Sequence, residues 1–491
     1  MSPAAFRRRS RTLLLSLPLF LIGSIHAARA VSVLPQGFAT YVGLADCDGI
    51  AEWHGDLFLA CHSVVNQLPG QGAELKPRES KGDAYVVRLN QTTGKLVYAT
   101  LLGGNGYGAA FRIKVDRQGC AYATGVTRAR DFPTTLDAVQ RSFGGGENDA
   151  FVVKLAPDGR VLYSTFLGGT DAEESYGLDV DVRGGVFVAG TTWSADFPGQ
   201  RKVHVATKGD AFVSYLRAGD PKSLRSVVFG GNQEEKLSGI ALDGRGGLFA
   251  VGHTKSTNFP LIQPMQAGLK GAQNVFLVRL NARSLIPTLA TYFGGSGEDF
   301  GWGVTVDRHG NPVVAGTTSS GDLPVAADAF QRAPKGGLDV FVAVFRWARH
   351  EVRVTYFGGS KDDSSGYDGD DVKVDSAGNV WVVGFTSSPD LPGTSGFPPQ
   401  QGREANRGFV AAFSPSLTGL CFAVYDGGSE GEQLEGLALS SDGALALATG
   451  FSLSSEIPAE AVVDRQKNAT RLNGHDVHTR VLAVPTAMSC R

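Results

Sequence analysis

The sequence repeats itself with a period of about 64 residues, and this repetition restricts the fold more than any other feature. Each unit holds an apolar run that ends in a Gly-Gly pair, then two short alternating runs separated by a glycine-containing turn. The first glycine of the pair stands at Gly103, Gly168, Gly230, Gly294, Gly358 and Gly427, with Gly43 in a degenerate copy. The turn glycine stands at Gly55, Gly119, Gly184, Gly246, Gly310, Gly378 and Gly443. Short runs joined by such turns are typical of β-hairpins.

A proline motif and two further runs complete each unit. A proline follows the second run at a constant distance and is preceded by a polar and an apolar residue, as in Asp131-Phe132-Pro133. We expect the apolar side chain to be buried and the proline to stiffen the start of the next loop. The third and fourth runs are exemplified by "DAFVVKL" (149–155) and "VLYSTFLGG" (161–169). Each unit therefore contains four short predicted strands, named A to D in chain order.

Seven such units predict an all-β, seven-bladed β-propeller with four antiparallel strands per blade. One small sheet cannot bury both of its faces, whereas sheets stacked around an axis can. An open β-solenoid is the alternative, and it would need shorter rungs and extra caps. The predicted blades cover about 48–104, 112–169, 177–231, 239–295, 303–359, 371–428 and 436–482 plus 37–43.

The phase of the repeats predicts how the ring closes. The repeats begin on a D strand at 37–43 and end after a C strand at 476–482, so the last blade lacks a D strand of its own. We expect residues 37–43 to complete that blade and close the ring. A loose N-terminal strand on an open ring is the alternative, but an unpaired edge is unfavourable.

Residues 1–30 have the pattern of a secretory signal peptide. Arg7, Arg8, Arg9 and Arg11 precede an apolar run from Leu13 to Ile25, and Ala28-Arg29-Ala30 provides a cleavage site with small residues. An uncleaved N-terminal anchor is the alternative. We expect residues 31–491 to form a single exported domain in the periplasm, at the cell surface or outside the cell. No other segment is apolar and long enough to span a bilayer, so we expect no membrane span after cleavage.

Charge and cysteine content restrict the partners and the compartment. Removal of residues 1–30 leaves 41 basic against 48 acidic residues, which argues against nucleic acid as a partner. Export permits disulfides. Cys47 and Cys61 flank the first A–B hairpin nearly opposite each other, which predicts a cross-strand disulfide. Cys421 and Cys490 form a second candidate pair that would pin the C-terminal tail, and Cys120 is expected to be a buried free thiol.

The middle units resemble the SBBP family, the bacterial seven-bladed β-propeller repeat. The resemblance rests on "YSTFLGGTDAEESYGLDVDVRGGVFVAGTTWSADFP" (163–198) and "GVTVDRHGNPVVAGTTSSGDLP" (303–324), and it covers roughly 37–484. The first unit departs from the pattern at Glu52 and Cys61, and the last at Ser440 and His478. The resemblance implies an exported or cell-surface propeller, and it brings no catalytic residues with it.

The strand order predicts on which face a binding site would lie. The A–B and C–D connections are short and share one face, the short-turn face, whereas the B–C and D–A loops emerge on the opposite, long-loop face. The D–A loops are acidic and offer candidates for a ligand or Ca²⁺ site. These acids are Asp46, Asp48, Asp171, Glu173, Glu174, Glu234, Glu235, Glu298, Asp299, Asp362, Asp363, Asp368, Asp370, Asp371, Glu430, Glu432 and Glu435. The densest cluster is 361–371; the alternative is that these acids solvate loops and cap turns.

Other polar residues carry no recognisable catalytic motif. A repeated aspartate next to the turn glycine is expected to form an Asx turn: Asp116, Asp181, Asp243, Asp307 and Asp375. The nine histidines have no metalloprotease spacing, and no nucleophile elbow, P-loop or dinucleotide fingerprint occurs. The sequence therefore favours a non-catalytic scaffold that binds a protein or glycan of the cell envelope. An envelope hydrolase or lyase that uses carboxylates and Ca²⁺, and a purely structural surface protein, stay open as alternatives.

Overall fold

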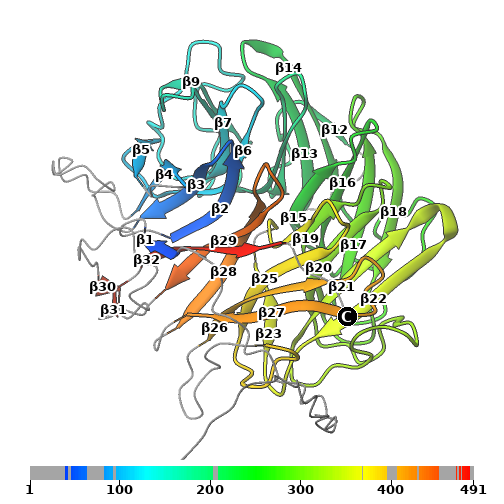
Figure 1. Cartoon of the computed structure of the whole chain (residues 1–491). Coiled ribbons are helices and arrows are strands. Elements are labelled where there is room, and N and C mark those ends of the chain that lie inside the picture. The colour runs from blue at the N-terminus through cyan, green and yellow to red at the C-terminus, as the bar shows by residue number, and fades with distance from the viewer. Residues whose placement is uncertain are drawn as a thin grey trace, which may run out of the picture. The chain divides into compact units, whose positions relative to one another are not determined.

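Seven antiparallel four-stranded sheets form a ring in the computed structural model of this chain (Figure 1). The structure describes residues 39–41, 46–63, 82–91, 95–202, 208–367, 369–394, 406–427, 431–452, 471–472, 475–476 and 478–486. They all belong to one unit, Gly37–Arg491. The predicted signal peptide, Asp368 and Cys490 lie outside the described residues. The fold is the all-β, seven-bladed propeller that the repeats predict.

Blades I to IV follow one another along the chain. Blade I contains β2 (Asp46–Trp53), β3 (Asp56–Ser63), β4 (Asp83–Asn90) and β5 (Leu96–Leu101). Blade II contains β6 (Gly108–Val115), β7 (Ala121–Thr127), β8 (Asp149–Leu155) and β9 (Val161–Leu167). Blade III contains β10 (Glu173–Val180), β11 (Gly185–Thr192), β13 (Asp210–Arg217) and β14 (Asp220–Phe229), with the short β12 (Gln200–Lys202) added in parallel to β14. Blade IV contains β15 (Glu235–Leu242), β16 (Gly247–Thr254), β17 (Asn274–Asn281) and β18 (Pro287–Phe293).

Blades V to VII continue the series. Blade V contains β19 (Asp299–Val306), β20 (Pro312–Thr318), β21 (Asp339–Arg346) and β22 (Glu351–Phe357), with a 3-10 turn, η1 (Trp347–Arg349), before β22. Blade VI contains β23 (Asp363–Ser365), β24 (Val372–Val374), β25 (Val380–Thr386), β26 (Arg407–Phe413) and β27 (Leu420–Asp426). Blade VII contains β28 (Glu432–Leu439), β29 (Leu445–Ser452), β32 (His478–Pro485) and β1 (Ala39–Tyr41). A small separate hairpin pairs β30 (Arg471–Leu472) with β31 (His475–Asp476).

The two ends of the ring share blade VII, as the phase of the repeats predicts. Strand β1 pairs antiparallel with β32, and Thr40 lies opposite Val481 (Figure 1). The last C strand, β32, begins two residues later than the sequence pattern predicts and runs to Pro485. An apolar cluster then joins blade VII to blade I, with Leu447 and Val481 packed with Leu57 and Leu59. The ring is therefore closed by a strand exchange between the two ends and by an apolar junction.

The space between neighbouring blades holds the hydrophobic core. One cluster combines Tyr122 and Val152 of blade II with Leu178 and Val188 of blade III. The apolar residue of the proline motif is buried in the five blades where the structure describes it: Phe132, Phe197, Phe259, Leu323 and Leu391. Each blade thus buries both faces against its neighbours, because a four-stranded sheet of this size cannot do so alone.

The short turns have the chemistry that the sequence predicts. In the A–B turn of blade III, one oxygen of Asp181 accepts hydrogen bonds from the backbone N–H groups of Arg183 and Gly185. Asp116, Asp243 and Asp307 bond their turns in the same way. The seven turn glycines all have φ between 68° and 93°, where a side chain would be strained. These aspartates are therefore structural residues of the short-turn face.

No helix in the described part of the chain is long and apolar enough to cross a membrane.

Candidate functional site at the axis of the ring

The A strands of neighbouring blades contact one another, so they line the axis of the ring. The A strand is continuous in six blades, all except blade VI. Near its start, each of these six strands contains a β-bulge, where one or two residues have no partner in strand B. Such bulges re-aim a side chain and are frequent beside functional sites. The skipped residues are Cys47 and Asp48, Phe111, Tyr176, Ser238, Trp302 and Glu435. The bulges thus bring residues of six blades to one level of the axis, close to the long-loop face.

Aromatic side chains dominate this level of the axis. Phe111 and Tyr176 of adjacent blades stack with ring centroids 5.0 Å apart. On another arc, Phe300 stacks on Trp302 at 5.4 Å, and Trp302 meets Tyr367 edge to face at 5.5 Å. These five residues form what we call the axial collar. Tyr367 is exposed and the other four are half-buried, so the collar presents aromatic surface to solvent.

A segment of blade VI crosses the axis beneath the collar. Between β23 and β24 the chain leaves its own sheet, and Asp370 pairs with Gly436 of blade VII in an isolated bridge. Gly369, with φ of 92°, packs so closely against the Ser238 carbonyl of blade IV that a Cβ would collide with it. We call Gly369–Asp371 the axial plug. The plug replaces the continuous A strand that the sequence pattern predicts for this blade.

Buried charges hold the axial plug in place. Lys114 of blade II lies 3.1 Å from Asp370 Oδ1, and Lys373 of blade VI lies 2.8 Å from the same oxygen. Asp371 is fully buried, and burial raises the pKa of its carboxyl to about 7. Arg112 of blade II is also buried and acts electrostatically on both aspartates. The densest predicted acidic cluster is therefore neutralised in part by lysines and an arginine within the ring.

Five acids that begin the A strands are buried at the blade junctions. These residues, which we call the junction carboxyls, are Glu173, Glu235, Asp299, Asp363 and Glu432. Glu173 accepts hydrogen bonds from the Gly169 N–H at 2.9 Å and from the Thr192 hydroxyl at 2.6 Å. Glu235 has the equivalent bonds from Gly231 and Thr254. Asp299 and Asp363 make the same two contacts, so these four junction carboxyls tie the Gly-Gly loop to the end of strand B.

Several of these acids lie beside a second acid from the preceding blade. Gly168 packs between the carboxylates of Glu173 and Asp149, and Gly358 packs against Asp339, which interacts with Asp363. Burial raises the pKa of Glu173 to about 7, and hydrogen bonds from Ser194 and Thr192 oppose the shift. Burial likewise raises the pKa of Asp363 to about 7 and that of Asp149 to about 6.

Two junctions place a hydrogen-bond donor where the others have the second acid. Asn274 donates to Asp299 Oδ2 at 2.9 Å, and Arg407 Nη1 lies 2.9 Å from Glu432 Oε2. In these two blades, the residue beside the junction carboxyl is a hydrogen-bond donor, an amide or a guanidinium. We infer that the junction carboxyl needs a donor at this position. In the blades with a second acid, a protonated carboxyl can be that donor.

The other predicted acids are distributed over separate loops. Asp171, Glu298 and Asp362 are exposed, and Glu174 is half-buried. Asp362 accepts a hydrogen bond from the Leu338 N–H at 3.0 Å. Within the described residues, the predicted acids do not form one cluster. They divide into the junction carboxyls, the axial plug, the neighbouring Asp46 and Asp48 of blade I, the buried Glu435 of the blade VII bulge, and single exposed or half-buried side chains.

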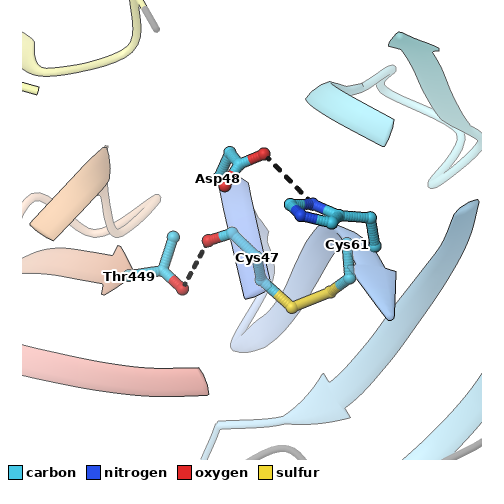
Figure 2. Close-up of a disulfide and its surroundings, with 5 residues drawn as sticks. Cys47, Asp48, Cys61 and Thr449 are labelled. Atoms are coloured by element: carbon cyan, nitrogen blue, oxygen red, sulfur yellow. Dashed lines mark hydrogen bonds and ion pairs between the residues drawn. A yellow bond between two sulfur atoms is a disulfide. The ribbon is translucent and has the colours of Figure 1, made fainter. Parts of the chain in front are cut away.

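Blade I differs from the blades that have a junction carboxyl bonded to a strand-B threonine. At these two positions it has Asp46 and His62. Asp46 pairs in register with His62, as Glu173 pairs with Thr192 in blade III. Asp48 lies in the bulge, and its Oδ2 is 3.6 Å from His62 Nδ1 (Figure 2). His62 also contacts Tyr107 and Phe111, with centroid distances of 6.5 Å and 6.4 Å. This group therefore adjoins the axial collar.

A disulfide joins the two strand segments that carry Asp46, Asp48 and His62. Cys47 and Cys61 are bonded across β2 and β3, with their Cα atoms 4.0 Å apart (Figure 2). The Thr449 hydroxyl of blade VII donates to the Cys47 carbonyl at 3.2 Å, which links the disulfide to the ring closure. Cys421 is also disulfide-bonded, and its predicted partner Cys490 is not described. Cys120 is free and buried, as expected.

His62, Lys114 and the aromatic residues of the axial collar were not among the residues that the sequence singled out. For His62 the signal exists: strand B ends in a threonine at Thr127, Thr192, Thr254, Thr318 and Thr386, and a histidine stands in that register in blade I. For the axial plug the signal is an insertion. Gly358 and Gly378 are 20 residues apart, whereas Gly294 and Gly310 are 16 apart.

A groove lies on the short-turn face, between blades V and VI. It has a volume of about 330 Å³, and its lining includes His309, Val344, Arg346 and Pro415. It contains none of the residues of the axial collar or the junction carboxyls.

The fold and its axial site thus define a seven-bladed propeller with an aromatic collar at the axis. No known family model matches the chain. The regulatory protein FlaEY of Caulobacter vibrioides is 24% identical over 324 residues, which are 62% of this chain and 33% of that protein. The chain therefore matches about a third of the length of this relative.

Similar solved structures are distant in sequence. A puromycin hydrolase mutant is 11% identical with a TM-score of 0.42, and the match covers 84% of this chain and 50% of that chain. The endosialidase of phage phi92 is 8% identical with a TM-score of 0.43, covering 91% and 69%. The WD40 domain of Neurospora crassa Pan2 is 10% identical with a TM-score of 0.42, covering 90% of each chain.

Proposed function

We propose that this protein is an exported, non-catalytic β-propeller of the SBBP type that acts as a binding scaffold at the cell envelope. Its partner is a protein or a glycan, and the long-loop face binds it at the axial collar. The observation that carries this proposal is the convergence of half-exposed aromatic side chains from different blades on one level of the axis.

Aromatic side chains of this kind suit a binding surface. They offer a large apolar area at a low cost in side-chain entropy, and they are enriched at binding hot spots. The stacked pairs Phe111–Tyr176 and Phe300–Trp302 fix the ring planes before a partner arrives. Such preorganisation increases affinity because less ordering is needed on binding.

The axial plug supports docking onto the face rather than passage through the ring. Asp370 is held by Lys114 from blade II and by the Leu437 N–H, which donates to the Asp370 carbonyl at 2.9 Å in blade VII. The plug therefore gives the axial collar a fixed floor, and a partner would contact the collar from the long-loop side.

The burial of the junction carboxyls argues for a scaffold over a hydrolase or lyase that would use these acids. Carboxylates that act on a substrate must face it. Glu173, Asp299 and Asp363 are instead buried and bonded within the blade junctions. The relative named as a regulatory protein is also in keeping with a role in binding.

Two observations support export. The N-terminal segment has the pattern of a signal peptide, and the Cys47–Cys61 disulfide is of a kind that persists in oxidising compartments. Localisation of the tagged protein after cell fractionation tests this part independently of binding.

Capture of envelope components tests the proposed function. The full-length protein is immobilised and incubated with envelope extract, before and after the extract is treated with protease or with glycan-degrading enzymes. We expect retention of a specific component that is lost on Trp302→Ala and kept on Val182→Ala, an exposed position of the short-turn face. The treatment that abolishes capture tells whether the partner is a protein or a glycan. Equal capture by both variants would overturn the proposed face.

A further inference from the structure

Three side chains of blade I are arranged as ligands around one point. Asp46, Asp48 and His62 each offer one ligand atom, and these atoms lie within 4.8 Å of one another. Two donors bound at 2.0–2.2 Å to one metal ion lie at most about 4.4 Å apart, so small side-chain movements would allow these three atoms to share an ion. In the part of the chain that the structure describes, no other group of three or more His, Cys, Asp or Glu side chains meets this condition.

Two polar atoms of this group, Asp46 Oδ1 and His62 Nδ1, are enclosed and have no hydrogen-bond partner in the described structure, although His62 Nδ1 lies 3.6 Å from Asp48 Oδ2. The Tyr85 hydroxyl is also without a partner, in a side chain that is only 1% exposed. Asp46 acts electrostatically on this hydroxyl. Buried polar atoms without partners are unfavourable, and several around one point indicate a missing ligand.

Blades III to VI show that this is a local departure from the repeat. In these four blades, a strand-B threonine donates to the junction carboxyl, as Thr254 does to Glu235 at 2.6 Å. Blade I has His62 at that register position, and its Nδ1 makes no such bond with Asp46. Blade I therefore has two potential metal ligands, Asp46 and His62, at the positions where blades III to VI have a carboxyl hydrogen-bonded to a threonine.

The disulfide gives the group a rigid support. Cys47 stands between Asp46 and Asp48, and Cys61 precedes His62, so one covalent link joins the two short segments that carry all three side chains. A site whose ligands are held in place before binding loses less entropy when the ion arrives.

We propose that Asp46, Asp48 and His62 bind one divalent transition-metal ion, with Zn²⁺ as the expected occupant. Zn²⁺ takes imidazole nitrogen and carboxylate oxygen as ligands, whereas Ca²⁺ prefers sets of six to eight oxygens. Three protein ligands leave at least one coordination position for water or for an oxygen of a partner. Tyr107 and Phe111 adjoin His62, so this position lies next to the axial collar. The inference does not depend on the proposed function, because it concerns the binding of the ion alone.

Calorimetric titration with Zn²⁺ tests the proposal. The full-length protein is prepared without a histidine tag or reducing agent, treated with a chelator and dialysed. We expect saturable binding of one Zn²⁺ per chain and no comparable binding of Ca²⁺. The variant His62→Thr restores the residue of the other blades and should weaken Zn²⁺ binding at least about tenfold, the loss that changes in outer-shell residues already cause. The control His309→Ala changes an exposed histidine of the short-turn face and should bind as the wild type does.

Asp46→Asn provides a second variant of nearly the same shape, and the melting temperature of each variant shows that it is folded. Zn²⁺ should raise the melting temperature of the wild type and of His309→Ala, but not that of His62→Thr or Asp46→Asn. The proposal is overturned if folded wild-type protein gives no saturable binding. It is also overturned if His62→Thr and Asp46→Asn bind Zn²⁺ as tightly as the wild type, or if Ca²⁺ binds equally well.

Discussion

Lys114 and Asp370 form an ion pair across the axis of the ring, with Lys114 Nζ 3.1 Å from Asp370 Oδ1. The two residues are 256 positions apart in the sequence and belong to blades II and VI. Burial disfavours the ionised form of Asp370, but Lys114 and Lys373 outweigh burial and hold the pKa of that carboxyl well below its ordinary value. The pair thus fastens the axial plug to the opposite side of the ring.

Asp370→Asn should destabilise the protein, because it leaves the ammonium groups of Lys114 and Lys373 without their anionic partner. Breaking a buried ion pair from one side costs about 3–5 kcal/mol. Since both lysines are partly exposed, we expect the lower end of that range in urea denaturation. Asp362→Asn, in the same acidic stretch but exposed, serves as the control and should change stability by less than about 0.5 kcal/mol. Equal effects of the two changes would contradict the account of the plug.

Stability should fall as the pH rises from about 4.5 to about 7, owing to the junction carboxyls. The pKa of Glu173 is raised in the folded state to about 7 from an ordinary value of 4.5, and that of Asp363 to about 7. In this window the folded protein binds more protons than the unfolded chain, so its stability is greatest at the low end. Thermal unfolding at closely spaced pH values measures the effect. Glu173→Gln keeps the hydrogen-bonding shape without a titrating proton and should flatten the curve.

Glu432→Gln is the matched control for this pH effect. Glu432 occupies the same position in blade VII but is paired with Arg407 instead of a second acid. Its replacement should lower the melting temperature at every pH, because it leaves a buried guanidinium without its partner. A flattened pH profile in Glu432→Gln, or an unchanged one in Glu173→Gln, would refute proton sharing at the acid pairs.

Loss of the Cys47–Cys61 disulfide should destabilise blade I and the ring closure. The bond spans 14 residues, and closing a loop of this size contributes roughly 3 kcal/mol in the chain-entropy account. The double variant Cys47→Ser/Cys61→Ser should therefore melt several degrees lower than the wild type. Cys120→Ser removes the free thiol and should leave the melting temperature nearly unchanged. If both variants melt like the wild type, the disulfide does not support the fold.

Deletion of residues 31–43 should open the ring. It removes β1, the outer strand of blade VII, and leaves β32 with an unpaired edge. We expect a clearly lower melting temperature and increased self-association in gel filtration. An unchanged melting temperature would show that β1 contributes little to closure.

The repeat made most of the fold predictable. The spacing of the Gly-Gly pairs and turn glycines predicts seven blades, and the phase of the units predicts the pairing of β1 with β32. The backbone at the A–B turn of each blade has a positive φ, which favours glycine. The turn glycines therefore mark the same point of every blade in the sequence. The sequence pattern did not predict the axial plug. The signal for it is the four extra residues between Gly358 and Gly378.

The site was less predictable, because long-range packing determines it. The sequence places Glu173 in an acidic loop, where a solvated side chain is the ordinary expectation. In the structure its carboxyl is buried, is hydrogen-bonded to Ser194 of the B–C loop and lies beside Asp149 of the preceding blade. Likewise, the bulges that turn Tyr176 and Trp302 toward the axis interrupt the period-two pattern by one residue, and the sequence alone does not show where.

The central claim, that the axial collar of the long-loop face is the binding surface, is tested most directly by measuring the affinity of the captured envelope component for three proteins. These are the wild type, Trp302→Ala and Val182→Ala, each verified by its melting temperature. The account predicts at least a tenfold weaker affinity for Trp302→Ala, since aromatic hot-spot residues contribute about 2 kcal/mol or more, and an unchanged affinity for Val182→Ala. Full affinity in Trp302→Ala, or a loss confined to Val182→Ala, would contradict it.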